Sequence, residues 1–186
     1  MFSMRKLRVC ALCSVLLGLA VFAAACAAAD GSATSLSATF TDPFAYCAAV
    51  GTIDAPDARY AGPKVPDGVI EGFKKAAGLE ASTAPSDVFK KATIWRCMEG
   101  KVYACNFGAN LPCDSKAHTD KAPTEAMASY CAANPNSDFI PMSVTGHDTI
   151  YSWRCALDKP QLLEQIGTVD ARGYVAQIWY AIEPKP

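Results

Sequence analysis

The chain has 186 residues, 17 basic and 18 acidic side chains, and a formal net charge of −1. The first 25 residues carry three basic side chains (Arg5, Lys6 and Arg8) and no acidic one, so the remaining 161 carry 14 basic against 18 acidic, a balance of −4. Nucleic-acid recognition needs a clustered basic surface, and this composition argues against it. About 160 residues suffice for one domain with a hydrophobic core and leave little room for two.

The N-terminus has the layout of a secretory signal peptide over residues 1–25, with a basic start and an apolar run over 9–25. Two processing routes are open. Ala27-Ala28-Ala29 supplies the small residues that precede an ordinary signal-peptide cleavage site, here after Ala29. Ala23-Ala24-Ala25-Cys26 resembles a bacterial lipobox, for which cleavage before Cys26 would place a lipid on this cysteine. An uncleaved anchor over 9–29 is a third alternative. We expect an exported protein, either lipid-anchored in a bacterial envelope or free in the periplasm or medium.

Residues 26–40 are mostly Ala, Ser, Thr and Gly, and we interpret them as a flexible tether in front of a single domain over 41–186. Six of the nine cysteines remain after Cys26. An even number of cysteines in an exported chain predicts a disulfide framework, for which fifteen pairings exist. These cysteines are Cys47, Cys97, Cys105, Cys113, Cys131 and Cys155.

Three helices are expected. Asp42 is a good N-cap, Pro43 fits a first helical position and Gly51 fits a left-handed C-cap, which predicts a helix between them. Residues 66–78 carry an apolar stripe at helical spacing, and the opposite side, with Glu71, Lys74 and Lys75, reads as solvated. Residues 123–134 form the third helix. Its aligned apolar side chains are Met127, Tyr130 and Cys131.

Antiparallel strands are expected in the remaining apolar segments. Residues 94–97 and 102–105 flank Glu99-Gly100, a good two-residue hairpin turn. Three further apolar runs are separated by turn-forming residues over 157–160 and 170–173. These runs cover 149–155, 162–169 and 174–182.

A partial repeat relates Tyr46-Cys47-Ala48-Ala49 to Tyr130-Cys131-Ala132-Ala133, and Trp95-Arg96-Cys97 to Trp153-Arg154-Cys155. Alternate residues of a strand share a face, so each Trp lies on the side of its Cys and each Arg on the other. Among the fifteen pairings we favour Cys47–Cys97, Cys131–Cys155 and Cys105–Cys113. The fold class is therefore α+β, a small disulfide-stapled domain of short helices and antiparallel strands with a degenerate two-half repeat and a long insertion in its first half.

Motifs for chemistry are scarce. The two histidines, His118 and His147, have no metal-ligand spacing, and neither GxSxG nor a glycine-rich phosphate loop occurs, so we expect no metal and no cofactor. His147-Asp148 is the one acid/base candidate; the alternative is a turn in which Asp148 caps backbone groups. The remaining candidate carboxylates are dispersed: Asp54, Asp57, Glu71, Glu164 and Asp170.

Two features suggest binding. Arg96 and Arg154 share a sequence context and could clamp acidic groups, or could form structural ion pairs and aromatic stacks. If Cys105 and Cys113 are bridged, the loop between them could present Asn106, Phe107 and Asn110 to a partner. The alternative for this loop is that Phe107 and Leu111 point inward.

Several phrases together resemble a group of uncharacterised bacterial exported proteins, cysteine-rich proteins or lipoproteins, over residues 42–183. They are Thr52-Ile53-Asp54-Ala55-Pro56-Asp57-Ala58-Arg59-Tyr60, Gly108-Ala109-Asn110-Leu111-Pro112-Cys113, the paired Trp-Arg-Cys units and Val169-Asp170-Ala171-Arg172-Gly173. The resemblance implies export and implies no activity, ligand or catalytic residue.

We expect an envelope-associated binding or structural protein whose partner is an unknown envelope component or exported protein. One alternative is an envelope hydrolase that uses His147 with a carboxylate. Another is an inhibitor of a hydrolase that inserts the loop between Cys105 and Cys113.

Overall fold

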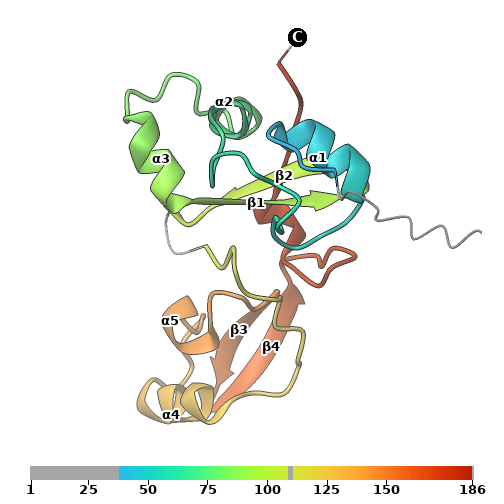
Figure 1. Ribbon diagram of the computed structural model, residues 1–186. Coiled ribbons are helices and arrows are strands. Elements are labelled where there is room, and N and C mark those ends of the chain that lie inside the picture. Colours follow the sequence, from blue (N-terminus) through green and yellow to red (C-terminus); the bar gives the residue numbers. More distant parts are fainter. Residues whose placement is uncertain (1–37, 109–110, 186) are drawn as a thin grey trace, which may run out of the picture. The chain divides into compact units, whose positions relative to one another are not determined.

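The structure is a computed structural model that describes residues 38–108 and 111–185 (Figure 1). The expected signal peptide, Cys26 and most of the expected tether lie outside these residues, as does Asn110. The fold is α+β, with short helices and two antiparallel sheets, as the sequence predicts. Within the described part of the chain, no helix is long and apolar enough to cross a membrane.

Helix α1 (Pro43–Val50) has the expected caps. The carboxylate of Asp42 accepts a hydrogen bond from the Ala45 N–H at 2.7 Å, and Gly51 takes a positive φ of 78° and donates to the Cys47 carbonyl. These contacts satisfy backbone groups that a helix end otherwise leaves unpaired. The buried face of α1 consists of Pro43, Tyr46 and Cys47.

Helix α2 (Asp67–Ala76) begins after Pro66 and buries Val69, Ile70 and Phe73, which belong to the expected apolar stripe. A short helix that the sequence analysis did not anticipate, α3 (Ser86–Ala92), follows it. Both helices lie in the long segment that separates Cys47 from Cys97.

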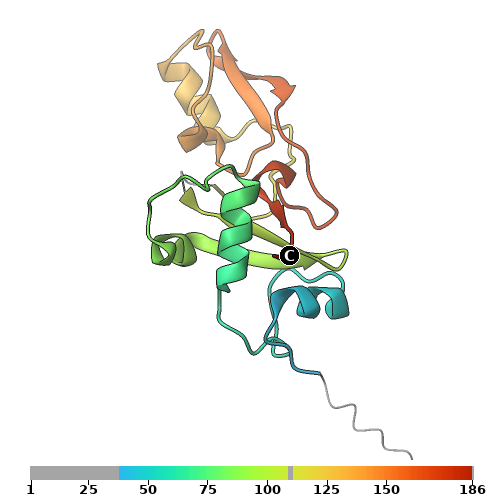
Figure 2. The same cartoon turned by 90° about the horizontal axis from the view of Figure 1, so that it is seen from above.

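The first sheet has the order β1-β2-β5, formed by β1 (Thr93–Met98), β2 (Lys101–Asn106) and β5 (Tyr180–Ile182). The expected turn joins β1 to β2, with positive φ at Glu99 (53°) and Gly100 (77°), as a two-residue hairpin of matching twist requires. Helices α1 and α2 lie on one face of this sheet (Figures 1 and 2). The core between them holds Tyr46, Cys47, Val69, Phe73, Trp95, Cys97, Val102, Ala104 and Ile182.

The second half contains α4 (Glu125–Ala133), α5 (Met142–Thr145) and a two-stranded sheet of β3 (Tyr151–Ala156) and β4 (Lys159–Gln165). The Thr124 hydroxyl caps α4 by accepting from the Met127 N–H at 3.2 Å. Met127, Cys131, Trp153 and Cys155 form the centre of a separate core.

The three favoured disulfides are all present: Cys47–Cys97, Cys105–Cys113 and Cys131–Cys155. The first and third staple a helix to the first strand of a hairpin, α1 to β1 and α4 to β3. Trp95 and Trp153 are each buried on the side of the neighbouring cysteine, as predicted. Disulfides of this kind indicate an oxidising environment.

The repeat extends beyond the motifs that reveal it. Cys97 exchanges two backbone hydrogen bonds with Ile53, which lies six residues after Cys47. The Cys155 N–H donates to the carbonyl of Ser137, which lies six residues after Cys131. Each half therefore contains a helix, an extended segment that begins at the same distance from the helix cysteine, and a hairpin. The distance from that segment to the hairpin differs, because α2 and α3 occupy the insertion in the first half.

The last expected strand differs from its prediction. Residues 174–182 form the 3₁₀ helix η2 (Ala176–Ile178) and then β5, which pairs with β2 and not with β4. Pro160 gives one reason. In the first sheet, Val102 lies opposite Cys97 and pairs on its other side with Ile182 of β5. The corresponding residue of β4, opposite Cys155, is Pro160. Proline has no N–H to offer a third strand at that position.

Candidate functional site

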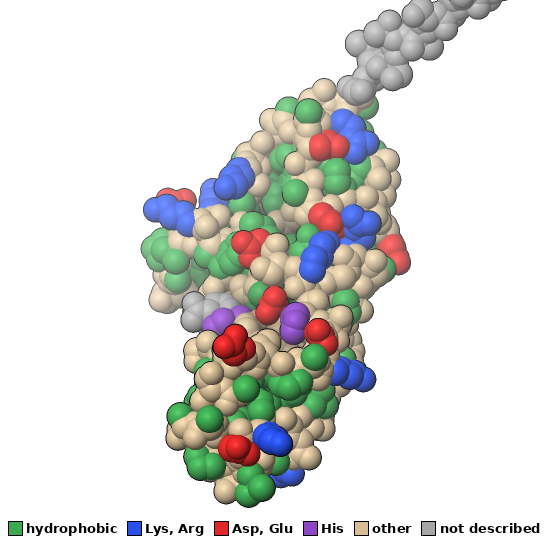
Figure 3. Space-filling model, turned by 90° about the horizontal axis from the view of Figure 1, so that it is seen from below, with side chains coloured by type: hydrophobic (Ala, Val, Ile, Leu, Met, Phe, Trp, Pro, Cys, Tyr) green, Lys and Arg blue, Asp and Glu red, His purple; other side chains and the backbone are tan. Residues whose placement is uncertain are grey.

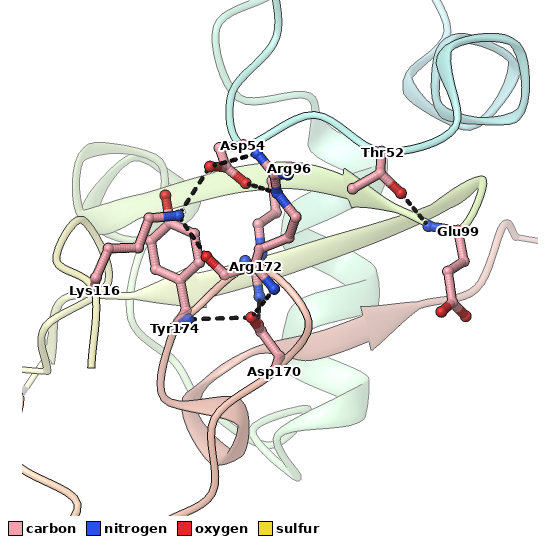
Figure 4. A network of polar contacts seen from close by, with 8 residues as sticks. All are labelled: Thr52, Asp54, Arg96, Glu99, Lys116, Asp170, Arg172 and Tyr174. Atoms are coloured by element: carbon pink, nitrogen blue, oxygen red, sulfur yellow. Dashed lines mark hydrogen bonds and ion pairs between the residues drawn. The ribbon is translucent and has the colours of Figure 1, made fainter. Parts of the chain in front are cut away.

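A cluster of charged side chains links segments far apart in the sequence (Figure 4). Asp54 accepts hydrogen bonds on Oδ1 from Arg172 Nε at 2.8 Å and on Oδ2 from Lys116 Nζ at 2.9 Å. Lys116 also donates to the Arg172 carbonyl at 2.7 Å and lies 3.5 Å from the centre of the Tyr174 ring. The cluster thus joins the residues after α1 to the two segments that connect the halves.

Arg96 lies next to this cluster and is completely buried. Its Nη2 pairs with Asp170 Oδ2, and its guanidinium lies 4.4 Å from the centre of the Tyr174 ring and 4.0 Å from that of Trp179. Asp170 accepts two backbone N–H groups on its other oxygen, from Arg172 and Tyr174. Arg96 therefore forms a structural ion pair and stacks on aromatic rings, which is the structural alternative given for this residue and not the clamp for acidic groups.

The hydrogen bonds to these carboxylates keep them ionised. The Arg172 hydrogen bond lowers the pKa of Asp54 to about 2, against the opposing effect of burial, and Lys116 contributes. The Arg59 hydrogen bond lowers the pKa of Asp57 to about 2. Burial acts to raise the pKa of Asp170, but hydrogen bonds from Arg96 and from two backbone N–H groups outweigh it and leave this pKa lowered. A general acid at neutral pH needs the opposite shift.

Both oxygens of Asp54, Asp57 and Asp170 are engaged by neighbouring donors. These donors use most of the acceptor capacity of the Asp54 and Asp170 carboxylates, three donors on each. We conclude that this cluster stabilises the fold.

The histidines do not assemble with these carboxylates. His147 is exposed, and His118 is half-buried, with a backbone N–H that donates to the Asp148 carbonyl at 2.8 Å. The chain's two histidines lie on the same face (Figure 3), yet neither side chain makes a hydrogen bond among the described residues. Over the same part of the chain, no group of three or more His, Cys, Asp or Glu side chains could hold a metal ion. The pairing of His147 with Asp148 stays a prediction.

In the bridged loop from Cys105 to Cys113, the described side chains of Asn106 and Phe107 contact the rest of the fold. The Asn106 amide donates to Thr93 Oγ1 at 2.9 Å and accepts from the Gly108 N–H at 2.9 Å. Phe107 and Leu111 are half-buried and pack against the cluster that contains Tyr174 and Trp179. This arrangement is the inward alternative for the loop.

Arg154 differs from Arg96 in being exposed. Its Nε donates to Gln161 Oε1 at 2.7 Å across the β3–β4 pair. A role for Arg154 in binding acidic groups stays a prediction.

An open groove of about 490 Å³ runs beside α2 and the outer strand β5. Its floor on α2 consists of Gly68, Gly72 and Ala76, which recur every four residues and so share one side of the helix. The remaining lining residues are Glu71, Lys75, Ala181, Glu183, Pro184 and Lys185. A volume of this size is in the range of ligand sites.

Gly72 allows α2 to approach β5 closely. A Cβ atom at this position would lie 2.2 Å from Ile182 Cγ2, so a side chain larger than hydrogen would push the helix and strand apart. At Gly68 the nearest atom to such a Cβ is 3.8 Å away, in the Phe44 ring. The groove therefore has one tight contact and an open end.

The sequence analysis did not identify this groove. It described the side of residues 66–78 that bears Glu71 and Lys75 as solvated; both residues are exposed, as expected, and they also line the groove. The available signal was the spacing of Gly68, Gly72 and Ala76, but without the position of β5 it does not predict a cavity.

Comparison with protein-family models, with curated proteins and with solved structures finds no match to this chain.

Proposed function

We propose that this protein is an exported, envelope-associated binding domain that holds a ligand in the groove beside α2 and β5 and catalyses no reaction. The observation that carries the proposal is the groove itself. It combines a floor of small residues, an open volume of about 490 Å³ and four exposed charged side chains.

The repeat supports this assignment. Helix α2 lies in the insertion of the first half, and β5 adds a third strand to the first sheet. Among the described residues of the second half, the hairpin β3–β4 has no third strand, and the helix between α4 and β3 is the four-residue α5. The groove is thus formed by β5, which has no counterpart in the second half, and by α2, which is longer than α5 in the same place of the repeat. We expect elements that differ in this way between the halves to be retained for binding.

The polar side chains also favour binding over catalysis. The buried or clustered carboxylates are held by Arg and Lys partners. At the groove, Glu71, Lys75, Glu183 and Lys185 are exposed, and the Lys185–Glu71 pair at 3.6 Å is itself open to solvent. Exposed charges on a preformed cavity orient a ligand at little entropic cost. Export is supported by the three disulfides and by the signal-like N-terminal sequence.

The test is site-specific cross-linking in the exporting bacterium. A photoreactive amino acid at position 71 in the groove and one at position 128 on the exposed side of α4 are compared. We expect a discrete adduct from position 71 and none from position 128. No adduct at position 71, or the same adducts at both positions, would contradict the proposal.

A further inference from the structure

We infer that the groove takes an extended peptide that adds to the free edge of β5, with small side chains and with charges of both signs. This inference rests on the proposed function and specifies its ligand. Four observations carry it: the direction of the backbone groups of β5, the length of the groove, its floor and its charges.

The direction of the backbone groups follows from a pair of hydrogen bonds. Cys97 and Ile53 exchange N–H and C=O bonds of 3.0 Å each, so Cys97 points these groups away from β2. Opposed residues of an antiparallel pair share this property, so Val102, opposite Cys97, points its N–H and C=O towards β5. Ile182 lies opposite Val102 and therefore points back at β2.

Backbone direction alternates along a strand, so Ala181 and Glu183 point their N–H and C=O groups away from β2. Ala181 and Glu183 both line the groove, whereas Tyr180 and Ile182 are not among its lining residues. Among the described residues, no further backbone partner for these groups occurs. The groove therefore offers unpaired donors and acceptors in the arrangement that an added strand uses.

The dimensions suit a short peptide. From Gly68 to Ala76 the helix rises about 12 Å, at 1.5 Å per residue. An extended chain advances about 3.4 Å per residue, so about four residues fill this length. Pro184 follows directly after Glu183 and lacks an N–H, which limits the ladder at that end.

The floor and the charges restrict the peptide further. Ile182 fills the space beside Gly72, whereas a Cβ atom at Gly68 would meet nothing nearer than the Phe44 ring at 3.8 Å. The room for a small side chain between the helix and the added strand therefore lies at the Gly68 end of the groove. The rim carries two carboxylates and two ammonium groups, Glu71 and Glu183 with Lys75 and Lys185, and Lys185 Nζ lies 3.6 Å from Glu71 Oε2. A peptide with one basic and one acidic side chain finds partners of opposite charge, whereas a peptide of one sign meets like charges.

The experiment titrates the oxidised, ¹⁵N-labelled protein with acetyl-Lys-Ala-Ala-Glu-amide and follows amide chemical shifts. We expect saturable shifts at Ala181, Glu183 and Gly72, with a Kd of about 1 mM. The same peptide with both alanine nitrogens methylated should bind at least about tenfold more weakly, because methylation removes strand donors. Peptides with two Lys or two Glu should also bind more weakly.

A pair of variants supplies the matched control. Ala76→Leu fills the groove from an exposed helical position and should abolish binding, while Ala128→Leu makes the same change on α4 and should leave binding unchanged. The methylated peptide provides a readout that does not depend on the folding of a variant.

Three outcomes would overturn the inference: absence of binding, equal binding of the methylated peptide, or self-association of the protein that Ala76→Leu abolishes, which would assign the groove to a second copy. If the peptides fail while position 71 still yields a cross-linked adduct, the peptide inference falls and the proposed function stands.

Discussion

Arg96 and Arg154 occupy corresponding positions in the two Trp-Arg-Cys strands, yet Arg96 is completely buried and Arg154 is exposed. The cause is the C-terminal segment, which places Asp170, Tyr174 and Trp179 against Arg96. The equivalent face around Arg154 carries Ser152 and Gln161 and is open to solvent. One half of the repeat has thus become an interior surface while the other has kept a polar outer face.

Replacing Arg96 by methionine should strongly destabilise the protein. The change leaves the buried carboxylate of Asp170 without its charged partner, which typically costs about 3–5 kcal/mol. Arg154→Met is the matched control and should change the free energy of unfolding by at most about 0.5 kcal/mol, because its partner Gln161 is exposed. Urea unfolding followed by tryptophan fluorescence measures both; equal losses would contradict the assigned roles.

Acid should destabilise the fold through its low-pKa carboxylates. The pKa of Asp54 is about 2 in the folded state against an ordinary value of 3.8, so folding favours the ionised form. This contribution is fully present above pH 4 or so and is lost as the pH falls towards about 2. Urea midpoints measured from pH 6 to pH 2 should fall less steeply for Asp54→Asn than for the wild type. A parallel decline of the two proteins would show that the Asp54 cluster does not contribute.

The disulfides should differ in their stabilisation according to the chain length that each closes. The separations are 50 residues for Cys47–Cys97, 24 for Cys131–Cys155 and 8 for Cys105–Cys113. Restriction of the unfolded chain then predicts about 4, 3.5 and 2.5 kcal/mol respectively. Paired Cys→Ala variants, compared by urea unfolding, should follow this order, and the largest loss for the 105–113 pair would argue against chain restriction as the main effect.

Two glycines of α2 should respond oppositely to alanine. Gly72→Ala places a methyl group against Ile182 and should destabilise by about 1–3 kcal/mol, with loss of the β5 pairing. Gly68→Ala meets only the Phe44 ring at 3.8 Å and should stabilise by up to about 1 kcal/mol, because it restricts the unfolded chain. Thermal unfolding of the two variants checks this; stabilisation by Gly72→Ala would refute the close contact of helix and strand.

Local chemistry in the sequence predicts much of the fold. Asp42 and Gly51 mark the ends of α1, Glu99-Gly100 marks the first hairpin, and the paired motifs predict all three disulfides. These features depend on neighbours in the chain or on matching motifs. The strand partner of β5 depends instead on which backbone N–H and C=O groups are free at the edges of β2 and β4. Pro160 removes one N–H from the edge of β4, but its position there is known only once the register of β3 and β4 is known.

The candidate site was harder to predict. Asp54 stood out as a carboxylate, but its partners lie 62 and 118 residues away, and no pattern connects them. The groove depends on how closely α2 approaches β5. Gly72 permits this approach, but a glycine in the sequence does not show which strand lies against it. The loop from 105 to 113 is a candidate because its cysteines are close in sequence, and among its described side chains those of Asn106, Phe107 and Leu111 contact the fold.

The most direct test of the account is the detection of intermolecular nuclear Overhauser effects between the protein and acetyl-Lys-Ala-Ala-Glu-amide. We predict contacts from the peptide Hα atoms to the amide protons of Ala181 and Glu183, together with contacts from alanine methyl groups to Gly72, in a pattern typical of an added antiparallel or parallel strand. Contacts confined to Phe107 or Arg154, with none along β5, would contradict the assignment of the groove as the binding site.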